Sequence, residues 1–145
     1  LHQDRGSDIR DGMDMALCTF DKNTHALEYA GANNPVFILS DGKLTTIKGS
    51  KLTVGSLEEN KVEPPTNHTV QLKKGDCFYI FSDGFVDQFG GADNKKFKTS
   101  KFQELLIAIN KQSMAEQEKS ICKAFMDWKG KNEQVDDVLI IGIRV

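Results

Sequence analysis

The segment Cys77–Phe81 consists entirely of apolar and aromatic residues. Successive side chains of a β-strand point to opposite faces of a sheet, so a strand of this composition needs cover on both faces. The sequence therefore predicts a central strand at this position. The preceding Lys74-Gly75-Asp76 is typical of a tight turn and marks where the strand begins.

Further short apolar segments, separated by turn sequences, predict more antiparallel strands. A meander is expected from residue 15 to residue 47, with strands at 15–20, 27–30, 36–39 and 44–47. Asp41-Gly42 is a strong tight-turn signal within it. Residues 68–72 alternate as a strand does, and residues 138–143 predict another buried strand. Residues 49–65 have no sustained period and are interpreted as a long loop.

Two helices are expected between residues 99 and 130, so the predicted fold class is α+β. In the first helix Thr99 or Ser100 is the candidate N-cap. Its apolar side chains recur at helical spacing, at Phe102, Leu105, Leu106 and Ile109. The second helix begins with the capping-box pattern Ser113-Met114-Ala115-Glu116 and ends near Gly130. Its Met and Trp side chains are interpreted as core residues rather than as a ligand site.

The composition is that of a soluble globular protein. The 145 residues suffice for one domain, and 39% hydrophobic with 28% charged residues excludes a disordered, collagen-like or coiled-coil chain. A net charge of -2 gives no electrostatic reason to expect nucleic acid or an anionic membrane as a partner. No apolar run approaches the roughly 20 residues that cross a bilayer, so no membrane contact is expected. Three widely spaced cysteines predict buried, reduced thiols and a cytoplasmic location.

Two acidic sequences adjoin the predicted buried strands. Ser82-Asp83-Gly84 follows Cys77–Phe81, and Asp136-Asp137 precedes the last strand. A carboxylate beside a low-dielectric core is costly without a nearby cation, and carboxylates are the ligands that suit Mg²⁺ or Mn²⁺. Gly84 would let the chain turn sharply after Asp83. Taken singly, however, Ser-Asp-Gly is also an ordinary turn after a strand, and Asp136-Asp137 could form a solvated loop.

Five segments, in a fixed order, carry a resemblance that covers the chain from about Asp11 to its C-terminus. They are Asp11-Gly12-Met13, Tyr29–Pro35, Lys74–Asp76, Phe81–Asp87 and Asp136–Val138. Together they resemble the metal-dependent serine/threonine protein phosphatases of the stage II sporulation protein E family, which are bacterial relatives of the type 2C phosphatases. The combination is far more specific than any one of its segments.

The resemblance implies a two-metal centre in which Asp83 and Asp136 are metal ligands. Asp137, beside the second ligand, and Gly84 take supporting roles. The cofactor would be Mn²⁺ or Mg²⁺, and a metal-activated water would hydrolyse a phosphoserine or phosphothreonine, with no separate catalytic residue and no covalent phosphoenzyme. The implied fold is an α/β/β/α sandwich, of which this chain would form a part, with antiparallel sheets and two C-terminal helices.

The sequence departs from the family pattern in two respects. The family's Ala-Gly-His-Asn-Pro appears here as Ala30–Pro35 without the histidine, so no role of that histidine is carried over. The family's early Asp and its later Asp-x-x-Gly-His-Gly segment do not occur, and Asp11 and Asp14 are interpreted as motif and loop residues. Residues 1–145 are therefore expected to be one truncated domain, the C-terminal half to two-thirds of a catalytic domain. In isolation it is expected to be inactive and to form homo-oligomers.

The same resemblance suggests the biological setting. The substrate would be a phosphorylated regulatory protein, such as an anti-sigma-factor antagonist, and an upstream sensor or receiver domain of a two-component system would lie in the same chain. A second hypothesis is a catalytically silent phosphatase-like module that binds a signalling partner, although the presence of both Asp83 and Asp136 argues against it. A third is an unrelated α+β domain with two acidic turns.

Overall fold

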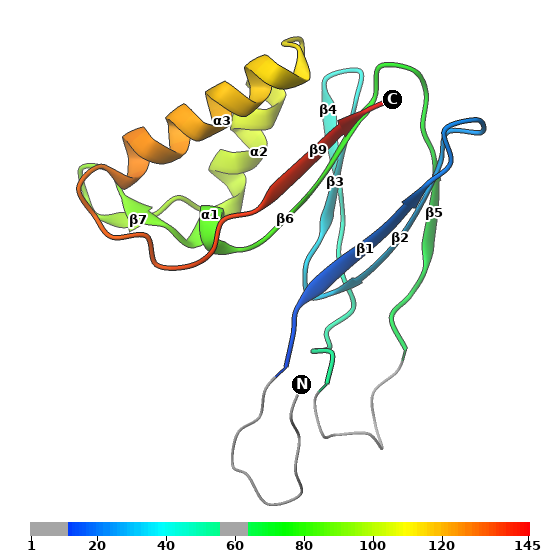
Figure 1. Ribbon diagram of the computed structural model, residues 1–145, viewed down its shortest axis with the longest axis horizontal. Helices are drawn as coiled ribbons and strands as arrows, with labels where there is room; N and C mark the ends of the chain where they lie inside the picture. The colour runs from blue at the N-terminus through cyan, green and yellow to red at the C-terminus, as the bar shows by residue number, and fades with distance from the viewer. Residues whose placement is uncertain (1–11, 56–63) are drawn as a thin grey trace, which may run out of the picture.

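The strand Cys77–Phe81 (β6) lies in the middle of a four-stranded antiparallel sheet, as its composition predicts. The computed structural model describes residues 12–55 and 64–145, and the strand order in this sheet is β4-β3-β6-β9 (Figure 1). The other strands are Val36–Ser40 (β3), Lys43–Ile47 (β4) and Ile140–Arg144 (β9). Every residue of β6 except the half-buried Ile80 is buried, because strands flank it on both sides and other layers cover both faces.

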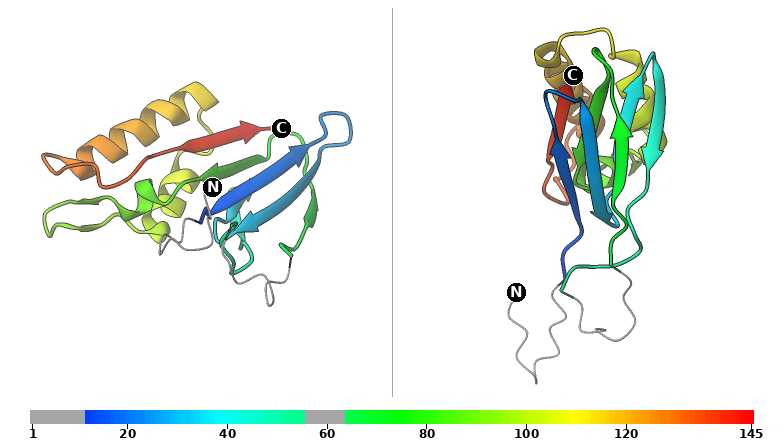
Figure 2. Two further views of the ribbon diagram at one scale, coloured as in Figure 1. Left: turned by 60° about the horizontal axis from the view of Figure 1, so that its bottom comes forward. Right: turned by 90° about the vertical axis from the view of Figure 1, so that its right-hand side faces the viewer.

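A second antiparallel sheet, with the order β1-β2-β5, packs against the first. Its strands are Met15–Phe20 (β1), Ala26–Ala32 (β2) and His68–Gln71 (β5). One core between the two sheets contains Leu27, Tyr29, Val36, Ile38, Leu72 and Phe78. The right-hand view of Figure 2 shows the β1-β2-β5 sheet in front of the other sheet. The expectation of two antiparallel sheets is confirmed.

The predicted meander from residue 15 to residue 47 is wrong in one connection. The hairpins β1–β2 and β3–β4 both form, but β2 and β3 belong to different sheets. The chain turns at Asn33, whose backbone is left-handed (φ 59°), and Ala32 pairs with Ser50. Two consecutive hairpins are compatible with one sheet or with two, so the spacing of apolar segments could not reveal this crossing.

Two helices cover the outer face of the four-stranded sheet (Figures 1 and 2). They are Thr99–Ala108 (α2) and Met114–Lys129 (α3). The core beneath them includes Phe37, Tyr79, Phe81, Phe85, Phe102 and Phe125. Ring centroids 4.7–6.1 Å apart make this cluster largely aromatic. Met114 and Trp128 pack against it, which confirms their interpretation as core residues.

The two helices begin in different ways. At α3 the predicted capping box is present: the Ser113 hydroxyl accepts from the Glu116 amide, and the Glu116 carboxylate accepts from the Ser113 amide. The prediction for α2 is wrong, because Lys98 rather than Thr99 or Ser100 occupies the N-cap and no side chain caps the helix. The Lys98 amide donates to the Val86 carbonyl, which fixes the chain direction and starts the helix at Thr99.

Between β6 and α2 lie three short elements. They are the one-turn helix Gly84–Asp87 (α1) and the hairpin of Phe89–Gly90 (β7) with Lys95–Lys96 (β8). Of the predicted loop 49–65, residues 49–55 are irregular apart from single bridges at Ser50 and Val54. Residues 56–63 and Asp11 lie outside the described residues.

Burial predictions are wrong at two places. The last strand is half-buried on one face and exposed on the other, where Ile141 and Ile143 are 42% and 37% exposed, and Leu139 just before the strand is 58% exposed. In the described part of the chain β9 is the outermost strand of its sheet, and the three-stranded sheet leaves this face of β9 uncovered. Of the three thiols predicted to be buried, Cys77 is buried and Cys18 is half-buried, but Cys122 on α3 is exposed.

Candidate metal centre

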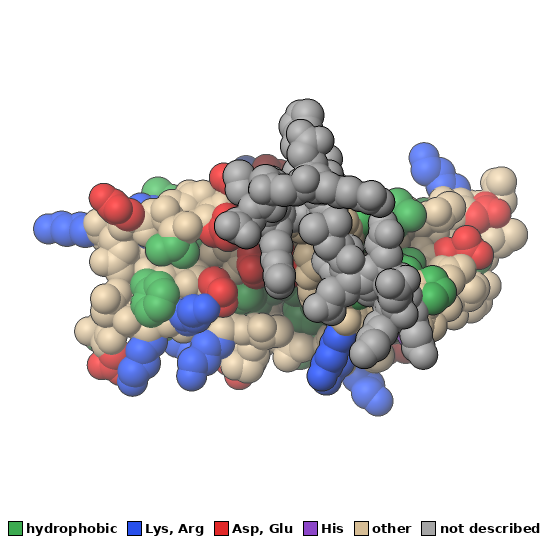
Figure 3. All heavy atoms as spheres, turned by 90° about the horizontal axis from the view of Figure 1, so that it is seen from below, with side chains coloured by type: hydrophobic (Ala, Val, Ile, Leu, Met, Phe, Trp, Pro, Cys, Tyr) green, Lys and Arg blue, Asp and Glu red, His purple; other side chains and the backbone are tan. Residues whose placement is uncertain are grey.

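The antiparallel pairing of β6 with β9 brings the two acidic sequences to the same end of the sheet. Phe81 is paired with Ile140, so the residue that follows β6 and the residues that precede β9 are neighbours. Asp83 is the N-cap of α1, two residues after the end of β6, and its side chain is exposed. Asp136 and Asp137 are likewise exposed, in the connection from α3 to β9. Seen from below, the described part of the molecule displays both acidic and basic side chains (Figure 3).

Ser82 fastens these two segments together. Its hydroxyl donates to the Asp137 carbonyl at 2.7 Å and accepts from the Leu139 amide at 2.9 Å. Its backbone amide donates to the Leu139 carbonyl at 2.9 Å, which extends the ladder between β6 and β9 by one bond. The serine of the Ser-Asp-Gly sequence therefore places the backbone of the acidic pair beside the start of α1.

Gly84 permits a close approach that any side chain would block. A Cβ built on Gly84 would lie 2.4 Å from the carbonyl oxygen of Asp137 and 3.2 Å from the carbonyl carbon of Asp136. A contact of 2.4 Å to a backbone oxygen essentially never occurs in folded proteins, so only glycine lets the first turn of α1 pack this closely against the 136–137 peptide. The structure thus brings together all four residues for which the sequence predicts site roles, namely Asp83, Gly84, Asp136 and Asp137.

The carboxylates have the chemistry of a hard-cation site. Among the described residues, none of Asp83, Asp136 and Asp137 forms an ion pair, so no lysine or arginine neutralises them. One oxygen of Asp136 accepts from the Asp137 amide at 2.7 Å, which orients that carboxylate. Mg²⁺ and Mn²⁺ bind few carboxylates and keep several waters, so two exposed aspartates fit part of such a site. In residues 12–55 and 64–145 no group of three or more His, Cys, Asp or Glu side chains is arranged to hold a metal.

Asp14 belongs to a different cluster of side chains. Its carboxylate accepts from the Asn33 amide at 2.8 Å and from the Thr53 hydroxyl at 3.3 Å. Asn33 lies in the segment where the family pattern has histidine. Its side-chain amide donates both to Asp14, just before β1, and to Thr53, in the loop after β4. The interpretation of Asp14 as a loop residue agrees with these contacts.

Sequence reasoning missed Gln88, which is fully buried at the end of α1. Its side-chain amide donates to the Glu133 carbonyl at 2.8 Å, and its side-chain oxygen accepts from the Val135 amide at 3.4 Å. Both partners belong to the connection that carries Asp136. A single glutamine between Asp87 and Phe89 fits a turn or a loop equally well, so no pattern in the sequence singles it out.

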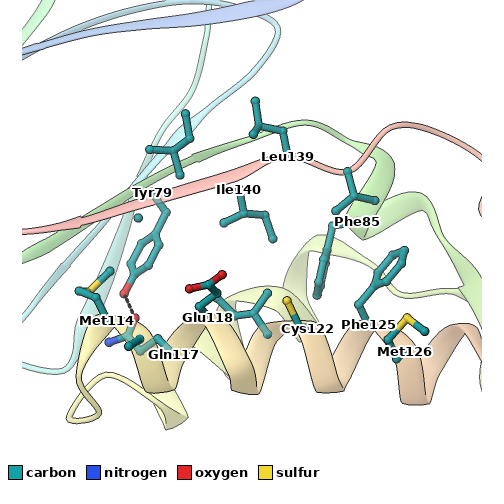
Figure 4. A pocket seen from close by; sticks show the side chains of 15 residues that line it. Tyr79, Phe85, Met114, Gln117, Glu118, Cys122, Phe125, Met126, Leu139 and Ile140 are labelled. Atoms are coloured by element: carbon teal, nitrogen blue, oxygen red, sulfur yellow. Dashed lines mark hydrogen bonds between the residues drawn. The ribbon is translucent and has the colours of Figure 1, made fainter.

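An apolar hollow of about 740 Å³ lies between α3 and β9. Figure 4 shows its side chains, among which the Tyr79 hydroxyl donates to the Gln117 side-chain oxygen at 2.7 Å. Burial of the Tyr79 ring raises the pKa of its hydroxyl, so this group remains a neutral donor. Apart from Gln117 and Glu118 the walls are mostly Ile, Phe, Met and Leu, which suit packing rather than phosphate chemistry.

The model of the stage II sporulation protein E (SpoIIE) family matches residues 1–145, the whole chain. The chain belongs to this family. No curated protein sequence matches it. None of the helices in the described ranges combines the length and the apolar character that crossing a membrane requires.

Solved phosphatase domains share the fold of this SpoIIE-family chain. The SiaA-PP2C domain of Pseudomonas aeruginosa superposes with a TM-score of 0.82 at 28% identity, over 91% of this chain and 51% of that domain. The SpoIIE phosphatase domain of Bacillus subtilis gives 0.67 at 14% identity, over 90% and 57%. The RsbU and RsbW domains of a Mycobacterium tuberculosis protein give 0.64 at 17% identity, over 90% and 35%. The chain therefore has the PP2C-type phosphatase fold and spans about half the length of the first two domains.

Proposed function

We propose that the protein carrying this chain is a Mn²⁺- or Mg²⁺-dependent phosphoserine/phosphothreonine protein phosphatase, and that Asp83 and Asp136 are two of its metal ligands. One observation carries the proposal: Ser82 and Gly84 hold the backbones of the two acidic segments in contact, inside a PP2C-type fold. Asp137 supports the site through its carbonyl, which accepts from Ser82, and through its amide, which orients the Asp136 carboxylate.

The residues of this chain would act mainly by position. When bound, a metal pair supplies an activated water for attack on phosphorus and positive charge against the phosphoryl oxygens. Asp83 and Asp136 would bind the metal ions from exposed positions at the end of a rigid sheet. The phosphorylated side chain of another protein can reach these positions. No hydroxyl or thiol of this chain needs to form a covalent intermediate.

We propose a phosphorylated regulatory protein as substrate, such as the antagonist of an anti-sigma factor, and a cytoplasmic site of action. Support for this setting is the similarity to a structure that contains RsbU and RsbW domains. A sensor or receiver domain elsewhere in the same chain would supply the input. The phosphorylated side chain of the substrate would bind at the exposed aspartates and not in the apolar hollow between α3 and β9, because the hollow offers few groups that bind phosphate.

The test uses the full-length protein, with p-nitrophenyl phosphate and a phosphothreonine peptide as substrates and Mn²⁺ as the cation. Asp83→Asn and Asp136→Asn each remove a charged oxygen ligand without touching the core, so both should abolish phosphate release while leaving the thermal unfolding profile nearly unchanged. The matched control is Asp127→Asn on the surface of α3, where the carboxylate pairs with Lys123, and it should keep full activity.

Near-normal turnover of either aspartate variant at saturating Mn²⁺ would refute the ligand assignment. Mn²⁺ binding by the parent protein with no phosphate release from any phosphorylated substrate would instead favour the silent, partner-binding module.

A further inference from the structure

Gln88 is a polar side chain with no exposed surface, between α1 and β7. Burying an amide costs free energy unless its donors and acceptor find partners. Here they all do: the nitrogen donates to the carbonyls of Phe89 at 3.0 Å and Glu133 at 2.8 Å, and the oxygen accepts from the Val135 amide at 3.4 Å. A side chain this fully bonded holds its partners in one arrangement.

The partners of Gln88 lie in a segment that has little apolar packing to hold it. Residues 133–137 are all exposed, and even the apolar Val135 is 55% exposed. Packing against the core therefore contributes little to the conformation of this segment. Gln88 anchors it on the N-terminal side of Asp136, at residues 133 and 135, and Ser82 anchors it on the C-terminal side, at residues 137 and 139.

Gln88 is itself held in place from a third direction. The indole nitrogen of Trp128, in the last turn of α3, donates to the Gln88 carbonyl at 3.0 Å, and the Phe97 amide donates to the same oxygen at 2.9 Å. A Cβ on Gly90 would lie 1.7 Å from the Trp128 carbonyl oxygen, so the hairpin and the helix end are in backbone contact. The anchor cannot drift without moving both elements.

We infer that Gln88 is a positioning residue for Asp136: its buried amide sets the segment 133–137 so that the Asp136 carboxylate faces the cation that Asp83 also binds. This inference rests on the proposed function. Gln88 touches neither metal nor substrate, and it acts only through the backbone of Glu133 and Val135. Loss of a hydrogen bond made directly to a metal ligand typically costs about 10- to 100-fold in metal affinity, and we expect the loss of Gln88, which acts one step further from the ligand, to fall at the lower end of this range.

The test compares two buried glutamines in the full-length protein. Gln88→Met keeps the side-chain volume but removes every hydrogen bond to residues 133 and 135. Gln117→Met is the matched control, since Gln117 is equally buried and bonds Tyr79 and the carbonyls of Asn110 and Gln112 at the opposite end of α3. The readout is Mn²⁺ affinity, measured by calorimetry and by the electron paramagnetic resonance signal of free Mn²⁺, together with kcat and KM at several Mn²⁺ concentrations.

Gln88→Met should raise the Mn²⁺ dissociation constant about 10-fold and recover part of its kcat at high Mn²⁺ with KM for the peptide unchanged. Gln117→Met should lower the melting temperature but leave Mn²⁺ affinity as it is. Unaltered Mn²⁺ affinity of folded Gln88→Met, beside an Asp136→Asn variant that has lost it, would overturn the inference alone. Unaltered affinity in Asp83→Asn and Asp136→Asn would overturn the proposed function.

If Gln88→Met does not fold, the Mn²⁺ affinity of Trp128→Phe tests the inference instead. This change removes the indole donor to the Gln88 carbonyl and keeps an aromatic ring against Phe97. A weaker affinity for Mn²⁺ in Trp128→Phe supports the inference, and an affinity equal to that of the parent overturns it.

Discussion

Replacing Gly84 by alanine adds a single carbon atom and should weaken both Mn²⁺ binding and phosphate release. The new Cβ would stand 2.4 Å from the Asp137 carbonyl oxygen and 2.9 Å from its carbon, whereas ordinary contacts begin at 3.4 Å. Both obstacles are backbone atoms, which cannot rotate away as a side chain would. The segment that holds Asp136 and Asp137 must therefore retreat from α1 by roughly 1 Å, and displacements of that size cost on the order of 100-fold in rate when the moved groups position the reaction.

The retreat also strains the two hydrogen bonds of the Ser82 hydroxyl. Overpacking of this kind costs about 1–3 kcal/mol of unfolding free energy, so Gly84→Ala should remain folded. The assay is Mn²⁺-dependent phosphate release by the full-length protein, with Mn²⁺ affinity and thermal unfolding measured on the same samples. We expect kcat to fall about 100-fold with weaker Mn²⁺ binding.

The control for this prediction is Gly142→Ala in β9. There the added Cβ would meet the Tyr79 ring at 2.9 Å and the end of the Met114 side chain at 3.0 Å, inside the core beneath α3. It should destabilise the protein by a comparable amount and leave the activity of the folded fraction unchanged. Full activity and normal Mn²⁺ affinity in Gly84→Ala would refute the argument that contact between these two segments sets the site.

Two further predictions concern stability and assembly. Hydrogen bonds from the Ser113 hydroxyl and amide lower the pKa of Glu116. Their stabilising effect is therefore present above the pKa of a free glutamate, about 4.3, and is lost as the pH falls through the lower pKa of the folded state. Ser113→Ala should lower the melting temperature at pH 7, and circular dichroism should show the difference from the parent shrinking below about pH 4. Residues 1–145 produced alone should self-associate, because Ile141 and Ile143 on the edge strand β9 and Leu139 just before it are exposed. They should release no phosphate, because Asp83 and Asp136 form only part of a two-metal site. A monomer in light scattering across a dilution series, or an active one, would contradict this.

Local patterns were enough to predict the parts of the fold that depend on local physics. An all-apolar strand such as β6 needs cover on both faces, which places it in the centre of a sheet. Ser113 followed three residues later by Glu116 is the sequence pattern of a capping box, which marks the start of a helix. The assignment of hairpins to sheets was not predictable, because it depends on the turn at Asn33 and on the pairing of Ala32 with the distant Ser50. The N-cap of α2 was missed for a similar reason, since the Lys98 amide is held by Val86, a residue outside the helix.

The candidate site divides in the same way. Asp83 and Asp136 were singled out because they stand near the ends of predicted buried strands and match the acidic motifs of the family, and antiparallel pairing of β6 and β9 brings such positions together. Their supports were not found. Ser82 acts through a carbonyl and an amide more than fifty positions away, and Gln88 acts through backbone groups that no sequence pattern marks.

A crystal structure of the full-length protein grown with Mn²⁺, with anomalous diffraction recorded at the manganese edge, would show whether Asp83 and Asp136 bind the metal. We expect an anomalous peak at coordination distance from carboxylate oxygens of both Asp83 and Asp136, beside the contact between the start of α1 and the segment before β9. Manganese bound elsewhere, with both carboxylates facing solvent alone, would contradict it.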